Sequence, residues 1–182
     1  MKQIEAMIKK SMDELQRMDT ETFKHAKKIP IIVILDEVRS MHNVGSAFRT
    51  ADSFRIEKII LCGLTPVPPH RDINKTALGA TETVHWMHEH STQEAIQKAR
   101  KDGYKIYSIE QAHNSIALQK VAFAKEEKIA FVFGHEVMGV QEDIIKESDA
   151  VVEIPQLGTK HSLNISVSLG IVLWQACHIY FE

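Results

Sequence analysis

The sequence lacks long hydrophobic runs and has few cysteines, and each absence excludes a class of protein. No run of about 18 apolar residues occurs, so we expect no membrane-spanning helix. The first residues lack the hydrophobic region of a signal peptide, which favours a cytoplasmic protein. The two cysteines, Cys62 and Cys177, lack the spacing of a metal site, and we expect both to be buried thiols.

Signatures of common ligand sites are also missing. The sequence has no G-x-G-x-x-G after a predicted strand and no G-x-x-x-x-G-K-[ST], which disfavours a standard dinucleotide-binding fold and a P-loop. His85, His88 and His90 lie close together in the sequence but do not form a clear tetrahedral set of zinc ligands. We therefore expect no metal.

The composition indicates one globular domain with an appended arm. The 182 residues are 44% hydrophobic and 25% charged, which suits a single core. Apolar residues recur at about every fourth position within 3–18, which predicts an amphipathic helix, and the polar stretch 19–28 separates it from the rest. We divide the chain into an N-terminal helical arm, 1–28, and a domain, 29–182. The net charge of −2 neither favours nor excludes an RNA partner, because a local basic surface is what RNA binding needs.

The domain alternates between apolar strands and helices. Continuous aliphatic runs such as Ile31–Leu35 are typical of strands buried on both faces. The alternation predicts an α/β fold with a mostly parallel sheet and helices on both faces. The proline-rich segment 65–71 is expected to be a loop. We predict strands at 31–35, 58–61, 84–86, 104–109, 129–133 and 151–154, and helices at 43–54, 73–78, 92–101, between the last two strands, and at 163–181.

The last predicted helix, 163–181, is apolar on two sides. Leu169 lies on one apolar face, and Val167, Ile171 and Trp174 lie on the other. Such a helix needs burial on two fronts. The sheet can cover one front, and we expect a second copy of the chain to cover the other.

Three short blocks, 43–51, 131–139 and 154–170, carry the features of a ligand site. The third block leaves a strand, crosses a polar loop and enters a helix, which places free N–H groups at a strand end where α/β proteins bind ligands. In the second block Gly134 lets a flat ligand approach the backbone, and Gly139 opens the next helix. Backbone groups of these two blocks would read an adenine edge.

In order and spacing, the three blocks resemble those of the TrmH-type (SpoU) RNA 2′-O-ribose methyltransferases of the SPOUT superfamily, over about residues 31–180. The resemblance implies an α/β fold whose C-terminal segment is threaded into a trefoil knot, a homodimer, and S-adenosylmethionine bound in the knot. Physical rules alone would not propose the knot, because threaded chains are very rare. The resemblance also implies that the cofactor is bound by Phe133, Gly134, His135, Gly139, Ile154, Gln156, Leu157, Gly158, Ser162 and Leu163, and that the catalytic residues are Asn43, Arg49, Glu136, Ser162 and Asn164.

Arg49 matches the arginine that activates the ribose hydroxyl in this family. A guanidinium stays protonated in proteins, so we expect Arg49 to orient the hydroxyl and stabilise developing negative charge while the proton leaves through the RNA phosphate or water. Structural roles remain open for the individual residues: Asn43 and Ser162 as helix caps, Glu136 as a partner of a helix dipole, and Arg49 as a solvated side chain.

The substrate is less well specified by the sequence. Tyr104–Leu118 looks most like family members that methylate a guanosine in the D-loop of tRNA, and the separate N-terminal RNA-binding domain of many ribosomal RNA enzymes is not seen. We therefore expect a tRNA substrate. Ribosomal RNA and a catalytically silent RNA-binding protein of the same fold are the alternatives.

Overall fold

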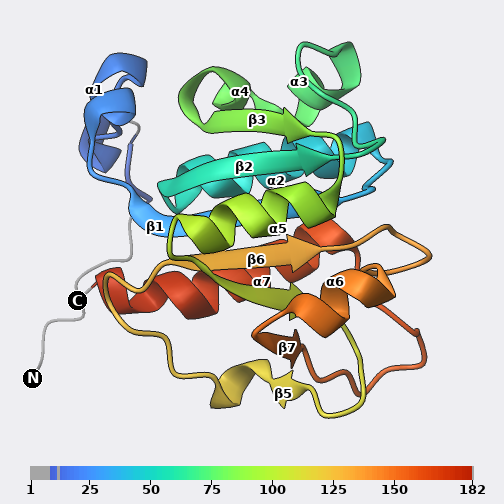
Figure 1. Ribbon diagram of the computed structural model, residues 1–182. Coiled ribbons are helices and arrows are strands. Elements are labelled where there is room, and N and C mark those ends of the chain that lie inside the picture. Colours follow the sequence, from blue (N-terminus) through green and yellow to red (C-terminus); the bar gives the residue numbers. More distant parts are fainter. Residues whose placement is uncertain (1–8, 12, 182) are drawn as a thin grey trace, which may run out of the picture.

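A computed structural model describes residues 9–11 and 13–181 and contains a seven-stranded sheet (Figure 1). The strand order is β3-β2-β1-β6-β4-β7-β5, and every strand pair is parallel. This confirms the predicted parallel α/β architecture. The strands are β1 (Ile29–Asp36), β2 (Ile56–Cys62), β3 (His85–Glu89), β4 (Lys105–Ile109), β5 (Ile116–Ala117), β6 (Ile129–Phe133) and β7 (Ala150–Glu153).

The aliphatic strand β1 lies next to β6 at the middle of the sheet, where both faces are buried. Alternate residues of β1 point into two separate cores, because side chains alternate across a strand. Ile31 and Val33 join the core under α2 and α7, whereas Ile32 and Ile34 join the core under α5 and α6. Helices therefore cover both faces, as predicted.

The helices agree with the predicted ones in place, although their ends differ. No helix in the described part of the chain is both long and apolar enough to cross a membrane. The α-helices are α1 (Thr20–His25), α2 (Met41–Ser53), α3 (Arg71–Ala77), α4 (Ala80–Thr83), α5 (Thr92–Lys101), α6 (Glu142–Glu147) and α7 (Ile165–Cys177), and the 3-10 helices are η1 (Asp13–Leu15), η2 (Leu118–Lys120) and η3 (His178–Tyr180).

Three predicted details at helix starts were wrong. Asn43 does not cap α2, because the Ser40 side chain accepts the N–H of Asn43 and the helix already begins at Met41. Asn164, rather than Ser162, caps α7 by accepting the N–H of Ser166 at 2.9 Å. Gly139 does not open a helix, since α6 starts only at Glu142.

The N-terminal segment differs from the expected arm and linker. Much of the predicted helix 3–18, including its first three apolar positions, lies outside the described residues, and the described part contains only the short η1. The expected polar linker contains α1, which Asp19 caps and which buries Phe23. The single apolar side chain at Phe23 explains why a polar segment packs against the body. The division at residue 28 stays a prediction.

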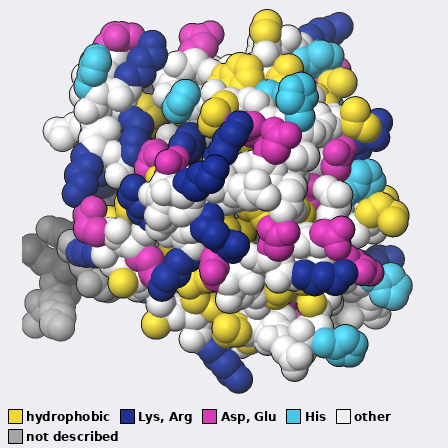
Figure 2. Space-filling model, in the orientation of Figure 1, with side chains coloured by type: hydrophobic (Ala, Val, Ile, Leu, Met, Phe, Trp, Pro, Cys, Tyr) yellow, Lys and Arg dark blue, Asp and Glu magenta, His cyan; other side chains and the backbone are white. Residues whose placement is uncertain are grey.

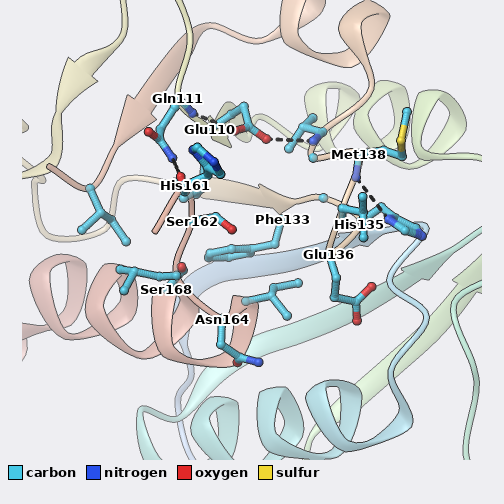
Figure 3. Close-up of a pocket in the computed structure, with 18 of the residues that line it drawn as sticks. Glu110, Gln111, Phe133, His135, Glu136, Met138, His161, Ser162, Asn164 and Ser168 are labelled. Carbon is cyan, nitrogen blue, oxygen red and sulfur yellow. Dashed lines mark hydrogen bonds between the residues drawn. The ribbon is translucent and has the colours of Figure 1, made fainter. Parts of the chain in front are cut away.

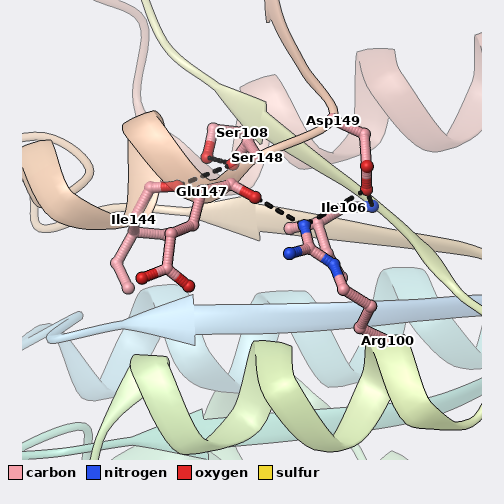
Figure 4. Close-up of polar contacts among 7 residues, drawn as sticks. All are labelled: Arg100, Ile106, Ser108, Ile144, Glu147, Ser148 and Asp149. Carbon is pink, nitrogen blue, oxygen red and sulfur yellow. Dashed lines mark hydrogen bonds and ion pairs between the residues drawn. The ribbon is translucent and has the colours of Figure 1, made fainter.

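A cluster of polar side chains joins the residues between α6 and β7 to β4 and α5 (Figure 4). The carboxylate of Asp149 accepts the N–H of Ile106 at 2.7 Å and forms an ion pair with Arg100 of α5 at 3.5 Å. The hydroxyls of Ser108 and Ser148 are hydrogen bonded at 2.7 Å. These contacts fix the end of the β6–β7 connection that enters β7.

Both cysteines are buried, as predicted. Burial raises the pKa of the Cys62 thiol and of the Cys177 thiol to about 12 each. A thiol with such a pKa is almost entirely protonated at neutral pH and is a poor nucleophile. Neither cysteine is suited to redox chemistry.

Candidate functional site

A cavity of about 660 Å³ opens at the carboxyl ends of β4, β6 and β7 (Figure 3). Its volume is in the range of small-molecule sites, and strand ends of this kind are where parallel sheets bind ligands. Three chain segments form its walls. They contribute Ile109, Glu110, Gln111, Phe133, Gly134, His135, Glu136, Val137, Met138, Gly139, Val140, Glu142, Ile145, Ile154, Gln156, His161, Ser162, Leu163, Asn164, Ile165 and Ser168.

The turn after β6 forms one wall and is held rigidly by its own backbone. His135 and Gly139 exchange two backbone hydrogen bonds of 3.0 and 2.9 Å. The His135 Nδ1 accepts the N–H groups of Val137 and Met138 at 3.0 and 3.3 Å. The turn therefore presents a preformed edge to the cavity.

Gly134 is required by the fold of this turn rather than by a ligand. A Cβ at this position would lie 2.1 Å from both the Gly139 carbonyl carbon and the Val140 nitrogen. The expectation that glycine here makes room for a flat ligand was wrong, because the chain's own backbone occupies that space. Gly139 has a φ of +71°, a conformation that favours glycine.

The carboxylate of Glu136 joins this turn to the start of α2. It accepts the N–H of Ser40 at 2.9 Å, the N–H of Arg39 at 3.1 Å and the Nδ2 of Asn43 at 2.9 Å. Partial burial raises the pKa of Glu136, but these hydrogen bonds outweigh it and hold the pKa below its ordinary value. Glu136 is thus an ionised acceptor and a weak base. The carboxylate also lies at the N-terminus of α2, beside its cap Ser40, where a negative charge complements the helix dipole.

Asn43 connects all three sequence blocks. Its Nδ2 donates to Glu136, while its Oδ1 accepts the Nδ2 of Asn164 at 3.1 Å. Asn164 in turn accepts the backbone and hydroxyl of Ser166 through its own Oδ1. The structure therefore brings together three of the five predicted catalytic residues in one hydrogen-bonded chain beside the cavity.

Most of the other predicted residues line the cavity, whereas Leu157, Gly158 and Arg49 do not. Ser162 lines the cavity, as do all the predicted cofactor-binding residues except Leu157 and Gly158. Leu157 is fully exposed on the 155–163 loop. Arg49 does not line the cavity: it is exposed on α2, six residues beyond Asn43 and therefore on a different side of that helix.

Sequence reasoning missed the wall formed by the end of β4. Glu110 accepts the N–H of Val140 at 3.0 Å, and the Nε2 of Gln111 donates to the carbonyl of His161 at 2.7 Å. The available signal was the position of these polar residues directly after a buried parallel strand. His135 and His161 both line the cavity as well.

The lining fits a cationic nucleoside ligand such as S-adenosylmethionine. The carboxylates of Glu110, Glu136 and Glu142 line the cavity, and its described lining includes no lysine or arginine. This charge suits a positively charged group. Phe133 and Ile154 add apolar surface beside the exposed backbone of the two strand ends.

Comparison with known proteins gives a consistent result. The SpoU rRNA Methylase family matches residues 30–174. An uncharacterized tRNA/rRNA methyltransferase of Borreliella burgdorferi is 32% identical over 85% of this chain and 66% of its own length. A tRNA (guanosine(18)-2′-O)-methyltransferase of Thermus thermophilus is 26% identical over 90% of this chain and 82% of its own length. A 23S rRNA (guanosine-2′-O-)-methyltransferase of Neisseria meningitidis is 27% identical over 84% of this chain and 60% of its own length.

Solved structures agree with these relatives. The AdoMet-bound rRNA methyltransferase of Sinorhizobium meliloti has a TM-score of 0.79 and 26% identity, covering 92% of this chain and 63% of that one. The A. aeolicus TrmH/SpoU tRNA modifying enzyme has a TM-score of 0.75 at 23% identity, covering 87% of this chain and 79% of that one, and shows the shared fold. This chain spans only 60 to 66% of the length of the first three curated relatives.

Proposed function

The chain belongs to the SpoU methylase family, and from that premise we propose that it transfers a methyl group from S-adenosylmethionine to a ribose 2′-hydroxyl of RNA. The observation that carries the proposal is the chain of hydrogen bonds from Glu136 through Asn43 to Asn164 at the edge of the cavity. It assembles polar groups from three distant blocks beside a cavity whose carboxylates suit a cation. A silent RNA-binding protein has no need of this assembly, so the catalytic function is favoured.

The chain's residues have defined tasks in this reaction. The cofactor supplies an electrophilic methyl group on a sulfonium, which is a good leaving group. The two strand-end segments at Gly134 and Ile154 would hold it through their backbone and apolar surface. Glu136 keeps Asn43 oriented, and Asn43 and Asn164 present polar groups beside the cavity. These residues position the hydroxyl in line with the methyl carbon and sulfur, which is the main requirement of the reaction.

The ribose proton requires a separate acceptor. Glu136 is a poor candidate because its hydrogen bonds lower its pKa. A guanidinium is a poor base in proteins, so the task of Arg49 is to orient the hydroxyl and stabilise negative charge on the oxygen while the proton passes to an RNA phosphate or water. Since Arg49 lies outside the cavity of its own chain, we propose that it serves a site shared between two subunits.

A homodimer would bury an apolar stripe on α7. Val167, Ile171 and Trp174 are 50%, 38% and 59% exposed, and they follow one another at helical spacing. The ring of Trp174 also contacts the rings of Phe54 and Phe181, which extend the stripe. Exposed apolar patches of this kind mark association surfaces.

Ile171→Glu tests the dimer. It should give monomers that lose methyl transfer while their circular dichroism stays unchanged. The control Gln97→Glu, at an exposed position of α5 on the other face of the sheet, should remain dimeric. Wild-type protein that sediments as a fully active monomer at assay concentration would rule out the dimer.

Three exposed arginines that lack an ion-pair partner among the described residues support the proposed RNA partner. The face with α5 mixes basic and acidic side chains (Figure 2). Arg39 before α2, Arg49 in the second half of α2 and Arg71 at the start of α3 are exposed and form no ion pair with any described residue. Free arginines of this kind suit phosphate groups.

For the substrate, we propose a guanosine in the D-loop of tRNA. The support is the match over 82% of the length of the T. thermophilus tRNA enzyme and the position of the 104–118 segment at the cavity wall. Ribosomal RNA is the second candidate, because relatives that act on 23S rRNA match to a similar identity. Mapping ribose methylation in tRNA and ribosomal RNA, from cells with and without the gene, decides between them.

We also propose that the C-terminal segment forms the trefoil knot expected from the family. Support comes from the hydrogen bond between Gln111, in the connection after β4, and His161, in the segment after β7. Stretching the chain between its termini tests the knot. A knotted chain should reach a shorter contour length than a fully extended chain, because the tightened knot retains residues. Extension to the full length would exclude it.

The catalytic proposal is tested through Arg49. Arg49→Ala should lower the rate of methyl transfer at least ~100-fold, as for removal of a preorganised charged donor. Binding of S-adenosylmethionine, measured by calorimetry, should change little. Arg49→Lys should also lose most of the rate, since a flexible ammonium cannot replace the planar fork. A rate within threefold of wild type would refute the role of Arg49.

A further inference from the structure

Two consecutive residues at the end of β4 hold the two opposite walls of the cavity (Figure 3). The Glu110 carboxylate accepts the N–H of Val140 at 3.0 Å and thereby contacts the turn after β6. The Gln111 side chain donates to the carbonyl oxygen of His161 at 2.7 Å and thereby contacts the loop after β7. The end of one strand therefore sets the separation of the two walls.

The wall after β6 has many supports besides Glu110. Its own backbone closes the turn between His135 and Gly139. The buried Asp36 accepts the backbone and side-chain N–H groups of Gln141 at 3.0 and 2.6 Å, and so fixes the far end of the turn. Loss of one contact should leave this wall in place.

The wall after β7 has far less support. Residues 155–163 contain no helix or strand, and nearly all of them are exposed. Among the described residues, the bond from Gln111 to His161 is the single hydrogen bond between this loop and any other segment. Yet Gln156, Ser162 and Leu163 of the same loop line the cavity. The position of these groups thus depends on one side chain outside the loop.

We propose that Gln111 is a positioning residue that closes the 155–163 loop over the cofactor site and so sets the affinity for S-adenosylmethionine. The effect on cofactor affinity rests on the function proposed above, whereas the tether itself does not. A typical hydrogen bond contributes about 1 kcal/mol net, which corresponds to a roughly fivefold change in a dissociation constant. Gln111 forms no hydrogen bond with Asn43, Glu136 or Asn164, so chemistry in the loaded enzyme should be largely unaffected.

Two measurements test the proposal on Gln111→Ala. In calorimetry, its dissociation constant for S-adenosylmethionine should rise about three- to tenfold. In limited trypsinolysis without cofactor, cleavage after Lys160, the residue next to the tethered carbonyl, should accelerate by a similar factor. Cleavage after the exposed Lys125 serves as an internal reference and should keep its wild-type rate.

Two further variants and the kinetics separate positioning from general destabilisation. Gln111→Glu should be at least as impaired as Gln111→Ala, because a carboxylate cannot donate to the His161 carbonyl. The exposed Gln119→Ala should behave as wild type. For Gln111→Ala, KM for the cofactor should rise while kcat at saturating cofactor stays within about twofold, as expected for loss of uniform binding.

The outcomes are distinguishable. Wild-type cleavage after Lys160 in Gln111→Ala would overturn the tether, and faster cleavage with an unchanged dissociation constant would overturn its effect on affinity. A wild-type protein that does not bind S-adenosylmethionine would contradict the proposed function and, with it, the effect on affinity. In that case, the cleavage rates would still decide whether Gln111 holds the loop.

Discussion

Replacement of Asn43 by alanine is the sharpest perturbation of the candidate site. Asn43 donates to the ionised Glu136 at 2.9 Å and accepts from Asn164 at 3.1 Å, so alanine removes both contacts at once. A hydrogen bond to a charged group contributes roughly 1.5–3 kcal/mol and a neutral one roughly 0.5–1.5 kcal/mol. Asn43 and Glu136 are only partly buried and Asn164 is exposed, so we expect the lower end of these ranges, a loss of about 2 kcal/mol in the free energy of unfolding.

A double-mutant cycle with Glu136→Ala, which removes the acceptor, isolates the contact between the Asn43 and Glu136 side chains. At pH 7 the coupling free energy should be about 1 kcal/mol. Because the folded-state pKa of Glu136 is lowered, its stabilisation is complete above the ordinary value of 4.5 and is lost as the pH falls through the folded-state pKa. The coupling should therefore shrink as the pH is lowered below 4.5.

Urea denaturation of the wild type, the two single variants and the double variant provides the measurement. Methyl transfer should fall in Asn43→Ala by a larger factor than cofactor affinity, since Asn43 lies beside the cavity and does not line it. Additive single variants at pH 7, with a coupling below about 0.3 kcal/mol, would refute the reasoning. The contact would then have no energetic consequence.

Two further predictions follow from the packing. Gly134→Ala should destabilise the protein by about 3 kcal/mol or more in urea denaturation, because the new methyl group meets backbone atoms at 2.1 Å, whereas Gly158→Ala, which meets no atom within 4 Å, should be neutral. Native protein should react very slowly with a thiol reagent such as 5,5′-dithiobis-(2-nitrobenzoate), because Cys62 and Cys177 are buried with raised pKa values, and rapidly once unfolded. Prompt reaction of the folded protein would contradict this burial.

The central strands of the sheet could be predicted from the sequence because they are continuous aliphatic runs, whereas the two-residue β5 was not predicted. In a strand such as β1, buried on both faces, no polar residue interrupts the apolar run before Asp36 at its end. α1 could not be predicted, since its six residues contain one apolar side chain and no period. The predicted cap of α2 was three residues away from the observed one, and that of α7 was two residues away. Several side chains able to cap a helix lie close together at each of these helix starts.

The site could be predicted only in part. Asn43, Glu136 and Asn164 occur in blocks with a recognisable pattern, and the structure brings them together. Glu110 and Gln111 carry no such pattern. Their role depends on which strands are neighbours, and the order β6-β4-β7 is a tertiary property that local sequence does not encode.

Incubation of the purified protein with tRNA and S-adenosylmethionine labelled in its methyl group tests the central claim most directly. Mass spectrometry of nuclease digests should locate the label on a ribose 2′-oxygen, and Arg49→Ala should abolish the signal. We predict a guanosine in the D-loop as the labelled nucleotide, and a label on ribosomal RNA alone would change the substrate and leave the chemistry intact. Label on a base, or no transfer to either RNA by protein that binds the cofactor, would contradict the account.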